Sequence, residues 1–389
     1  MDRSKTFFAG LAAGILAMAL AFAGYGAYGR FVRWGGLVEP SKKVGEILAL
    51  LDAHSINEYD ADELLGHMYA GLLDGVGDPY TYYYDETAFA DFKTQSDGRY
   101  SGVGMLVETD AADGFVTVSR VYPETPAWRA GILKGDKITA VDGTDAVPFE
   151  LSEVTGKTKG EPGTQVVLTI YRPSEGITFD AEITREIISV PTVYHRMLED
   201  GIGYIQIVQF DRATLGQFEE AYGELKSGGM RGLILDLRDN PGGLLETVVA
   251  IADILLPEGV ITYTEDKSGE RKYYRSNGTG DEIKAAVLIN GGSASASEVL
   301  SLAARELGGA MLFGSRTFGK GIVQNVYALS DGSAVKMTVS KYYSQSGVCI
   351  QGEGIIPDFI VGEDGGTPQN GEDACLLKAL EVLRGVVSK

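Results

Sequence analysis

Residues 285–307 read AAVLINGGSASASEVLSLAAREL: an apolar run, a stretch of glycines and serines, and a second run with apolar residues at helical spacing. The run 285–290 is typical of a buried strand, and 297–307 is typical of a helix. The small residues between them therefore predict a strand-to-helix turn. Backbone N–H groups at the start of a helix lack intrahelical partners and carry partial positive charge. A serine hydroxyl here would lie beside donors suited to an oxyanion, although such serines also serve as helix caps.

The alternation of strand and helix extends along the second half of the chain. Strands are expected at 203–208, 231–237 and 285–290, and helices at 215–227, 244–256 and 297–307. This order predicts βαβ units and a largely parallel sheet covered by helices. A polar, glycine-rich linker at 365–371 leads to a closing helix at 373–387, whose leucines form one stripe.

Two further regions precede this α/β part. Residues 34–95 carry apolar side chains at helical spacing and are expected to be mainly helical. From about residue 96 the apolar period changes to two. Strands are expected at 104–108, 115–121, 137–141, 165–171 and 178–183, with one short helix at 126–133. This region is therefore expected to form a small, mostly β domain.

The chain begins with a segment that is long and apolar enough to span a bilayer. Residues 7–28 carry no charge, and basic residues flank them on both sides. About 20 apolar residues cross a membrane, so the segment is a transmembrane anchor or a signal peptide, with a small-residue cleavage site at 21–23. The apolar run continues past that site, which favours an uncleaved anchor. A short N-terminus usually stays inside, so the rest of the chain is expected outside the cytoplasm, and secreted if the segment is cleaved.

The composition excludes several classes of protein. A length of 389 residues suggests two or three domains. There are 54 acidic against 34 basic side chains, a formal charge of −20. This charge argues against nucleic-acid binding, which depends on neutralising phosphates with lysine and arginine.

Histidine and cysteine are scarce. The three histidines, His54, His67 and His195, lie in no stretch that resembles a catalytic loop, so a Ser-His-Asp triad is not expected. No His-Glu-x-x-His motif or paired-cysteine motif predicts a metal site. Cys349 and Cys375 are expected to be inert thiols, with a disulfide left open because the chain is expected outside the cell.

A second stretch suited to catalysis is TFGKGIVQ at 317–324, in which Lys320 stands between two glycines and near apolar residues. Such a lysine could turn into a dry pocket, where burial lowers the amine pKa and leaves a neutral base. Gln324, four positions on, would lie on the same side and could orient the amine. The alternative is an exposed lysine in a glycine turn.

A third stretch, DLRDNPGG at 236–243, follows an apolar strand and precedes a helix. Its Pro-Gly-Gly turn could direct backbone N–H groups at a substrate carbonyl. Ordinary turn chemistry explains the same residues without any catalytic role.

Together the three stretches resemble those of the carboxyl-terminal processing, or tail-specific, proteases of the serine–lysine class. The motifs that carry the resemblance are LRDNPGG at 237–243, GSASASE at 292–298, FGKGIVQ at 318–324, QGEGIIPD at 351–358, GDPYT at 77–81 and YSGVG at 100–104. The resemblance extends from about residue 44 to the C-terminus.

The resemblance assigns roles to particular positions. It implies that Ser295 is the nucleophile, Lys320 the general base and Gln324 the residue that orients the lysine. The implied oxyanion donors are the backbone N–H of Ala296 and that of Gly242 or Gly243. It also implies a crotonase-like (ββα) core, with neither metal nor cofactor.

The small β domain resembles a PDZ domain, on the motifs PAWRAGILKGD at 126–136 and VDG at 141–143. PDZ domains bind a peptide C-terminus by strand addition and hold its carboxylate on backbone N–H groups. The resemblance places that loop at Ser101, Gly102, Val103, Gly104 and Met105. Lys159 stands where many relatives have arginine, so it keeps the charge and loses the bidentate fork.

The expected fold class is a multidomain α+β or α/β protein: a crotonase-like protease core and a PDZ domain, preceded by a transmembrane anchor and a helical segment. The expected boundaries are 1–33 for the anchor, 34–95 for the helical region, 96–187 for the PDZ domain, 188–363 for the core, and 364–389 for the C-terminal linker and helix.

The function expected from the resemblance is an extracytoplasmic serine endopeptidase that recognises substrate C-termini through its PDZ domain and cleaves through an acyl-enzyme. Its partners would be proteins or peptides with accessible C-termini and the membrane, and the flanking helices could support a homodimer. One alternative is a catalytically silent, membrane-tethered PDZ adaptor. A PDZ-linked trypsin-like protease is disfavoured, because no histidine fits.

Overall fold

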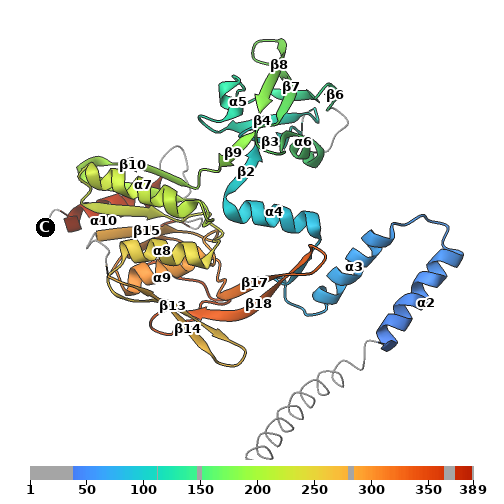
Figure 1. Ribbon diagram of the computed structural model, residues 1–389. Coiled ribbons are helices and arrows are strands. Elements are labelled where there is room, and N and C mark those ends of the chain that lie inside the picture. Colours follow the sequence, from blue (N-terminus) through green and yellow to red (C-terminus); the bar gives the residue numbers. More distant parts are fainter. Residues whose placement is uncertain (1–37, 112, 147–150, 279–283, 363–372, 388–389) are drawn as a thin grey trace, which may run out of the picture. The chain divides into compact units, whose positions relative to one another are not determined.

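The computed structural model describes residues 38–111, 113–146, 151–278, 284–362 and 373–387 (Figure 1). The chain divides into two compact units, Met1–Tyr69 and Ala70–Lys389. Helix α2 (Val38–His54) belongs to the first unit, and α3 (Ala61–Asp74) runs across the division. Among the described residues, no helix has the length and apolar character needed to cross a membrane. The expected membrane segment, 7–28, lies outside those residues.

The second unit contains a six-stranded sheet in the order β10-β11-β12-β15-β16-β19. Its strands are β10 (Val193–Met197), β11 (Ile202–Ile207), β12 (Gly232–Asp236), β15 (Lys284–Ile289), β16 (Met311–Gly314) and β19 (Phe359–Ile360). From β11 to β19 all neighbours are parallel, and β10 is antiparallel at one edge. The predicted parallel sheet is thus confirmed. The short 3-10 turn η1 (Glu199–Gly201), which reverses the chain before β11, was not predicted.

Helices cover both faces of this sheet because strand residues alternate between two apolar clusters. Ile205 and Leu235 face one cluster, and their neighbours Tyr204 and Ile234 face the other. The first cluster includes α7 (Thr214–Ser227), α8 (Leu245–Leu255) and α9 (Ala296–Glu306), and the second includes α10 (Ala374–Val387). The four helices confirm the expected segments to within one or two residues (Figure 1).

A second, antiparallel sheet was not predicted. It consists of β1 (Tyr82–Tyr84), β13 (Gly259–Asp266), β14 (Arg271–Ser276), β17 (Ile322–Ala328) and β18 (Ala334–Tyr343). Strand β1 pairs with β18 and sets Tyr82 opposite Lys336, although about 250 residues separate them along the chain. Helix α4 (Glu86–Asp97) follows β1. This pairing brings the 77–81 stretch to the strands that follow Lys320.

The expected small β domain has its own sheet and its own apolar cluster. Its elements are β3 (Met105–Thr109), β4 (Val116–Val121), α5 (Pro126–Arg129), β5 (Lys137–Val141), β6 (Thr144–Asp145), α6 (Leu151–Thr158), β7 (Gln165–Arg172) and β8 (Ile177–Thr184). Strands β2 (Arg99–Gly102) and β9 (Glu186–Ser189) pair at its two ends. The helix expected at 126–133 was predicted too long: it ends at Arg129, because the chain turns at Gly131 with φ 75°.

Candidate active site

Three serines lie around the start of α9, and two of them donate hydrogen bonds from their hydroxyls. Ser293 donates to the carbonyl oxygen of Leu237 at 2.8 Å, and Ser297 donates to that of Asn240 at 2.9 Å. Both are completely buried. These two serines fasten the turn to the 236–243 stretch. The Ser295 hydroxyl and the Glu298 side chain form a capping box at the start of α9, but this hydroxyl donates to no acceptor in the part of the chain that the structure describes, so its proton is the one left for chemistry.

Ser295 has a strained backbone at the N-cap of α9, with φ 54° and ψ −113°. A non-glycine residue in such a conformation costs about 1–3 kcal/mol and persists only where its surroundings hold it. Here the Glu298 carboxylate accepts the Ser295 N–H at 2.8 Å, and the Ser295 carbonyl accepts the Glu298 N–H at 2.9 Å. Ser295 therefore has a non-helical backbone, and the two hydrogen bonds with Glu298 fix its position.

Glu298 is a residue that sequence reasoning missed. Its side chain is completely buried and accepts four hydrogen bonds. The donors are Thr317 Oγ1 (2.6 Å) and the backbone N–H groups of Gly319 (2.8 Å), Ser295 (2.8 Å) and Lys320 (2.9 Å). One carboxylate thus ties the serine turn to the lysine loop. The Ser-x-x-Glu spacing at a helix start was the sequence signal that could have identified it.

Tyr342 makes a second link between the same two loops. Its hydroxyl contacts the carbonyl oxygen of Ser295 at 3.0 Å and also that of Lys320. The ring is buried, and burial raises the pKa of Tyr342 well above its usual value. A neutral, hydrogen-bonding Tyr342 therefore fixes both backbones from the side of β18.

Lys320 lies half-buried in the same cavity as Ser295. The cavity has a volume of about 530 Å³ and is also lined by Gln324, Lys336 and Tyr342. Burial, and then the positive charge of Lys336, lower the pKa of the Lys320 amine, while the carboxylates of Asp78 and Glu298 act against them. The environment thus makes the charged amine less stable than in water, which is the direction expected for a buried lysine base.

The glycines around Lys320 are required by close packing. A Cβ atom on Gly321 would lie 2.6 Å from the backbone nitrogen of Gln351, and one on Gly319 would lie 2.9 Å from that of Gly354. The side chain of Gln351 also accepts the Gly321 N–H at 2.8 Å. The motif at 351–358 therefore supports the lysine loop.

The amine and its expected partners are not hydrogen-bonded to one another. Lys320 Nζ lies over the ring of Tyr80, 4.6 Å from its centroid. Gln324 Nε2 is buried and has no hydrogen-bond partner among the described residues. The structure therefore brings Ser295, Lys320 and Gln324 to one cavity without joining their polar atoms.

The Pro-Gly-Gly turn reaches the serine directly. A Cβ atom on Gly242 would lie 2.8 Å from Ser295 Cβ, so only glycine fits there. The Gly242 N–H is already donated to Asn240 Oδ1 at 2.8 Å. Within the described residues, the N–H groups of Gly243 and Ala296 have no acceptor, and both residues line the cavity.

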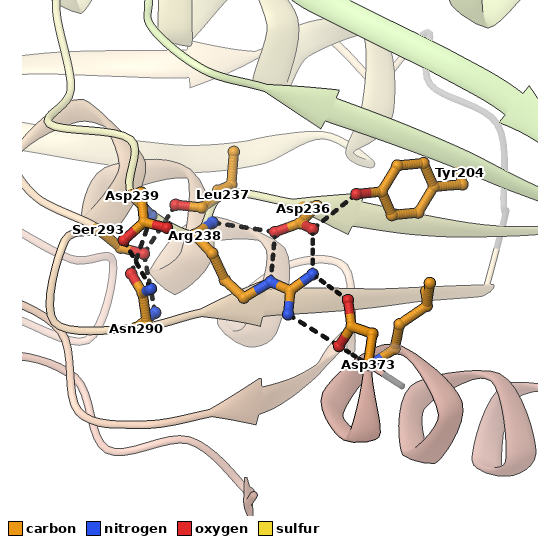
Figure 2. Close-up of polar contacts among 9 residues, drawn as sticks. Tyr204, Asp236, Leu237, Arg238, Asp239, Asn290, Ser293 and Asp373 are labelled. Carbon is orange, nitrogen blue, oxygen red and sulfur yellow. Dashed lines mark hydrogen bonds and ion pairs between the residues drawn. The ribbon is translucent and has the colours of Figure 1, made fainter. Parts of the chain in front are cut away.

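Two polar networks anchor the 236–243 stretch (Figure 2). In one, Asp239 and Asn290 are joined by two hydrogen bonds of 2.9 Å, which link this stretch to the serine turn. In the other, Arg238 contacts Asp236 at 2.6 Å and Asp373 at 2.7 Å. Burial acts to lower the pKa of Arg238, but its hydrogen bonds to the two carboxylates raise it well above its usual value. Tyr204 also donates to Asp236 at 2.7 Å.

The remaining titratable candidates lie elsewhere. No histidine in the described ranges lines the Ser295 cavity, and His195 contacts Glu224 at 2.9 Å. Cys349 and Cys375 are both free, and burial raises the pKa of Cys375 to about 12. Among the described residues, no group of three or more His, Cys, Asp or Glu side chains is arranged to hold a metal ion.

Part of the expected peptide loop of the small β domain lines a second cavity of about 370 Å³, which core residues such as Val208 and Asp211 also line. Val103, Met105 and Lys159 are among its lining residues, together with Tyr100. Gly104 has φ 88°, and its carbonyl accepts the Tyr122 N–H at 3.0 Å. The Lys159 amine lies 3.7 Å from a carboxylate oxygen of Asp91.

Comparison with known proteins identifies relatives of both domains. The model of peptidase family S41 matches residues 201–361, and that of the PDZ domain matches residues 117–172. A carboxy-terminal-processing protease of Bartonella bacilliformis is 33% identical over 326 residues, which cover 82% of this chain and 74% of that protein. A carboxyl-terminal-processing protease of Picosynechococcus is 34% identical over 309 residues, covering 78% and 74%. A solved photosystem II D1 C-terminal processing protease is 30% identical, covering 85% of this chain and 90% of that one, with a TM-score of 0.49.

Proposed function

The chain belongs to peptidase family S41, as a serine-type peptidase with a PDZ domain, and from this premise we propose that Ser295 and Lys320 are its catalytic dyad. The observation that carries the proposal is the Ser295 hydroxyl, which donates no hydrogen bond among the described residues and is held by a strained turn in the same cavity as the half-buried Lys320 amine. A serine nucleophile needs a base of this kind, because the hydroxyl is weakly reactive at its own pKa.

In the proposed reaction, neutral Lys320 accepts the proton of Ser295, and the serine oxygen attacks a peptide carbonyl. The oxyanion of the tetrahedral intermediate is held by the N–H groups of Ala296 and Gly243, which have no acceptor among the described residues. The Lys320 ammonium then protonates the leaving amine, and an acyl-enzyme remains. Water, deprotonated by Lys320, hydrolyses it. Gln324 would orient the amine while it is neutral.

We propose further that the PDZ domain binds the substrate's C-terminus. Strand addition along β3 would place the terminal carboxylate at the loop of residues 101–105 and the side chains against Val103 and Met105. Lys159, on the same cavity, would add an attractive charge.

We also propose that the peptidase acts outside the cytoplasm, anchored by the uncharged segment 7–28, or secreted if that segment is cleaved. Membrane fractionation and N-terminal sequencing of the mature chain test this. Sedimentation of the full chain tests the expected homodimer.

Cleavage of an unstructured protein by the wild type and by Ser295→Ala tests the dyad. We expect Ser295→Ala and Lys320→Met each to lower kcat by at least about 1,000-fold, while both variants still bind the substrate's C-terminal peptide. Ser227→Ala, at the exposed end of α7, is the matched control and should be unaffected. Equal cleavage by Ser295→Ala would refute the dyad. Peptide binding without cleavage by the wild type would favour the silent adaptor.

A further inference from the structure

Tyr80 is in direct contact with the lysine assigned above as the base. Its ring lies beneath Lys320 Nζ, with 4.6 Å between the nitrogen and the ring centroid. Tyr80 immediately precedes Thr81 and β1, and β1 is paired with β18 through Tyr82 and Lys336. The segment that carries the ring is therefore held against the strand next to the lysine loop.

A network within 78–81 holds the backbone that carries the ring. The Asp78 carboxylate accepts the Thr81 hydroxyl at 2.6 Å and the Tyr80 N–H at 3.1 Å. Thr81 is buried, and Tyr80 is half-buried. These contacts leave Tyr80 little freedom to move away from the lysine unless the whole turn moves.

The charged and titratable groups around the Lys320 amine come from three parts of the chain. Asp78 and Tyr80 lie before β1, Lys336 and Tyr342 lie on β18, and Glu298 lies on α9. A ring face attracts an ammonium and not a neutral amine, so Tyr80 and the two carboxylates favour the protonated form. Burial and Lys336 favour the neutral form. Tyr80 thus opposes the state that catalysis requires.

Polar groups near the amine indicate that it has a second position in the cavity. Gln324 Nε2 is buried without a partner, and the Ser295 hydroxyl donates to no acceptor among the described residues. An unsatisfied buried amide is costly to maintain, and the Lys320 amine is a group in the same cavity that could satisfy it. The contact with Tyr80 is therefore one of two positions open to the amine.

We propose that Tyr80 is a positioning residue whose ring holds the Lys320 ammonium in a resting position, from which the amine must move before it can accept the proton of Ser295. On leaving the ring, the ammonium releases one proton to solvent and becomes the neutral base. The inference rests on the proposed dyad, and it assigns the GDPYT stretch a role in setting when that dyad assembles.

A direct titration of Lys320 tests the contact without using activity. The full chain carrying Ser295→Ala, with 13Cε-labelled lysine, is titrated by NMR, and the Lys320 signal is assigned by its loss in Lys320→Met. Tyr80→Leu keeps an apolar side chain and removes the ring. We expect it to shift the protonation equilibrium of Lys320 toward the neutral amine by about two- to tenfold. Tyr80→Phe keeps the ring and should leave the equilibrium close to that of the parent.

The pH profile of peptide cleavage is the second readout. In Tyr80→Leu the ring no longer stabilises the ammonium, so the pKa of Lys320 falls and the neutral base is present at lower pH. The acid limb of kcat/KM should therefore move to lower pH in Tyr80→Leu and stay in place in Tyr80→Phe. Tyr327→Leu, on β17 and half exposed, is the matched control and should leave both readouts unchanged. Thermal unfolding of each variant confirms that the comparison is made on folded protein.

The outcomes separate this inference from the proposed dyad. If Tyr80→Leu leaves the Lys320 titration unchanged, or if Tyr80→Phe changes it as much as Tyr80→Leu does, the role of Tyr80 is refuted whatever the activity of Ser295→Ala. If Ser295→Ala cleaves as the wild type does, the dyad is refuted, and the NMR titration still decides the Tyr80 contact.

Discussion

At the residue scale, Glu298 determines how the two catalytic loops lie against each other. Among the described residues, Glu298 has the only side chain that accepts hydrogen bonds from the N–H groups of both Ser295 and Lys320. A buried carboxylate with four donors is well satisfied, whereas any neutral replacement leaves some of those donors without an acceptor.

Replacing Glu298 with glutamine keeps the shape and changes the hydrogen bonding. The new NH2 group would face two donors that the carboxylate oxygen had accepted. Each unsatisfied buried donor costs about 1–3 kcal/mol, so we expect Glu298→Gln to lose about 2–4 kcal/mol of stability and most of its activity. Urea denaturation and peptide cleavage measure these effects. Glu219→Gln, exposed on α7, is the control; wild-type stability in Glu298→Gln would contradict the role given to the carboxylate.

Lys336 acts on the same site through its charge. It lines the Ser295 cavity and lowers the pKa of Lys320, after burial the largest cause. In Lys336→Met that repulsion is gone, so the pKa of Lys320 rises and the neutral base is present only at higher pH. The acid limb of the pH–rate profile should therefore move up. Lys341→Met, exposed on the same strand, should leave it in place. An unmoved limb in Lys336→Met would rule out the electrostatic effect.

At the scale of elements, α10 is held to the sheet by apolar packing and by one buried ion-pair network. Cys375, Ala379 and Leu383 are completely buried against the sheet. At the start of the helix, Asp373 reaches Arg238, which also satisfies the buried Asp236 (Figure 2). The same 236–243 stretch continues into the turn beside Ser295, so α10 supports the catalytic turn from the far face of the sheet.

Arg238→Met should show how much this network contributes. It leaves Asp236, which has no exposed surface, without its cation. Breaking a buried pair from one side costs about 3–5 kcal/mol, and we expect that loss in chemical denaturation. Arg384→Met, which removes the ion pairs of α10 with the exposed carboxylates of Glu199 and Asp200, should cost about 1 kcal/mol or less per pair. Equal costs for the two variants would argue against a special role for the buried network.

At the scale of the whole molecule, substrate capture and hydrolysis are assigned to parts with separate apolar cores. The small β domain has its own cluster, which shares no residue with those of the peptidase sheet. Changes in the peptide cavity should therefore alter substrate binding and leave the chemistry at Ser295 intact.

Lys159→Glu tests this separation. Reversing an exposed charge at the peptide cavity should raise KM for a protein with a free C-terminal tail by about two- to fivefold. The kcat for a short peptide that does not reach the domain should not change. Lys134→Glu, exposed elsewhere on the domain, is the control. A fall in kcat for the short peptide would mean that the two parts are not independent.

Much of the fold followed from local pattern. The parallel strands β11, β12 and β15, the helices α7 to α10 and the turn before α9 were predicted from periodicity and small residues, because these features depend on neighbours within one segment. The two short parallel strands β16 and β19 were not predicted. The antiparallel sheet of β1, β13, β14, β17 and β18 was missed, and so was α6. Their pairings join distant segments, and nothing in the spacing of β1 indicates that it lies against β18.

The sequence by itself therefore determined the family, the parallel core and the three stretches that carry Ser295, Lys320 and the Pro-Gly-Gly turn. Only the tertiary structure decided which serine hydroxyl donates no hydrogen bond, which glycine has a free N–H among the described residues, and that Glu298 and Tyr342 join the two loops. The physical reason is that a motif fixes residue types along the chain, whereas hydrogen-bond partners and burial depend on what the fold places across from them. The ring of Tyr80 under Lys320 belongs to that second kind of information.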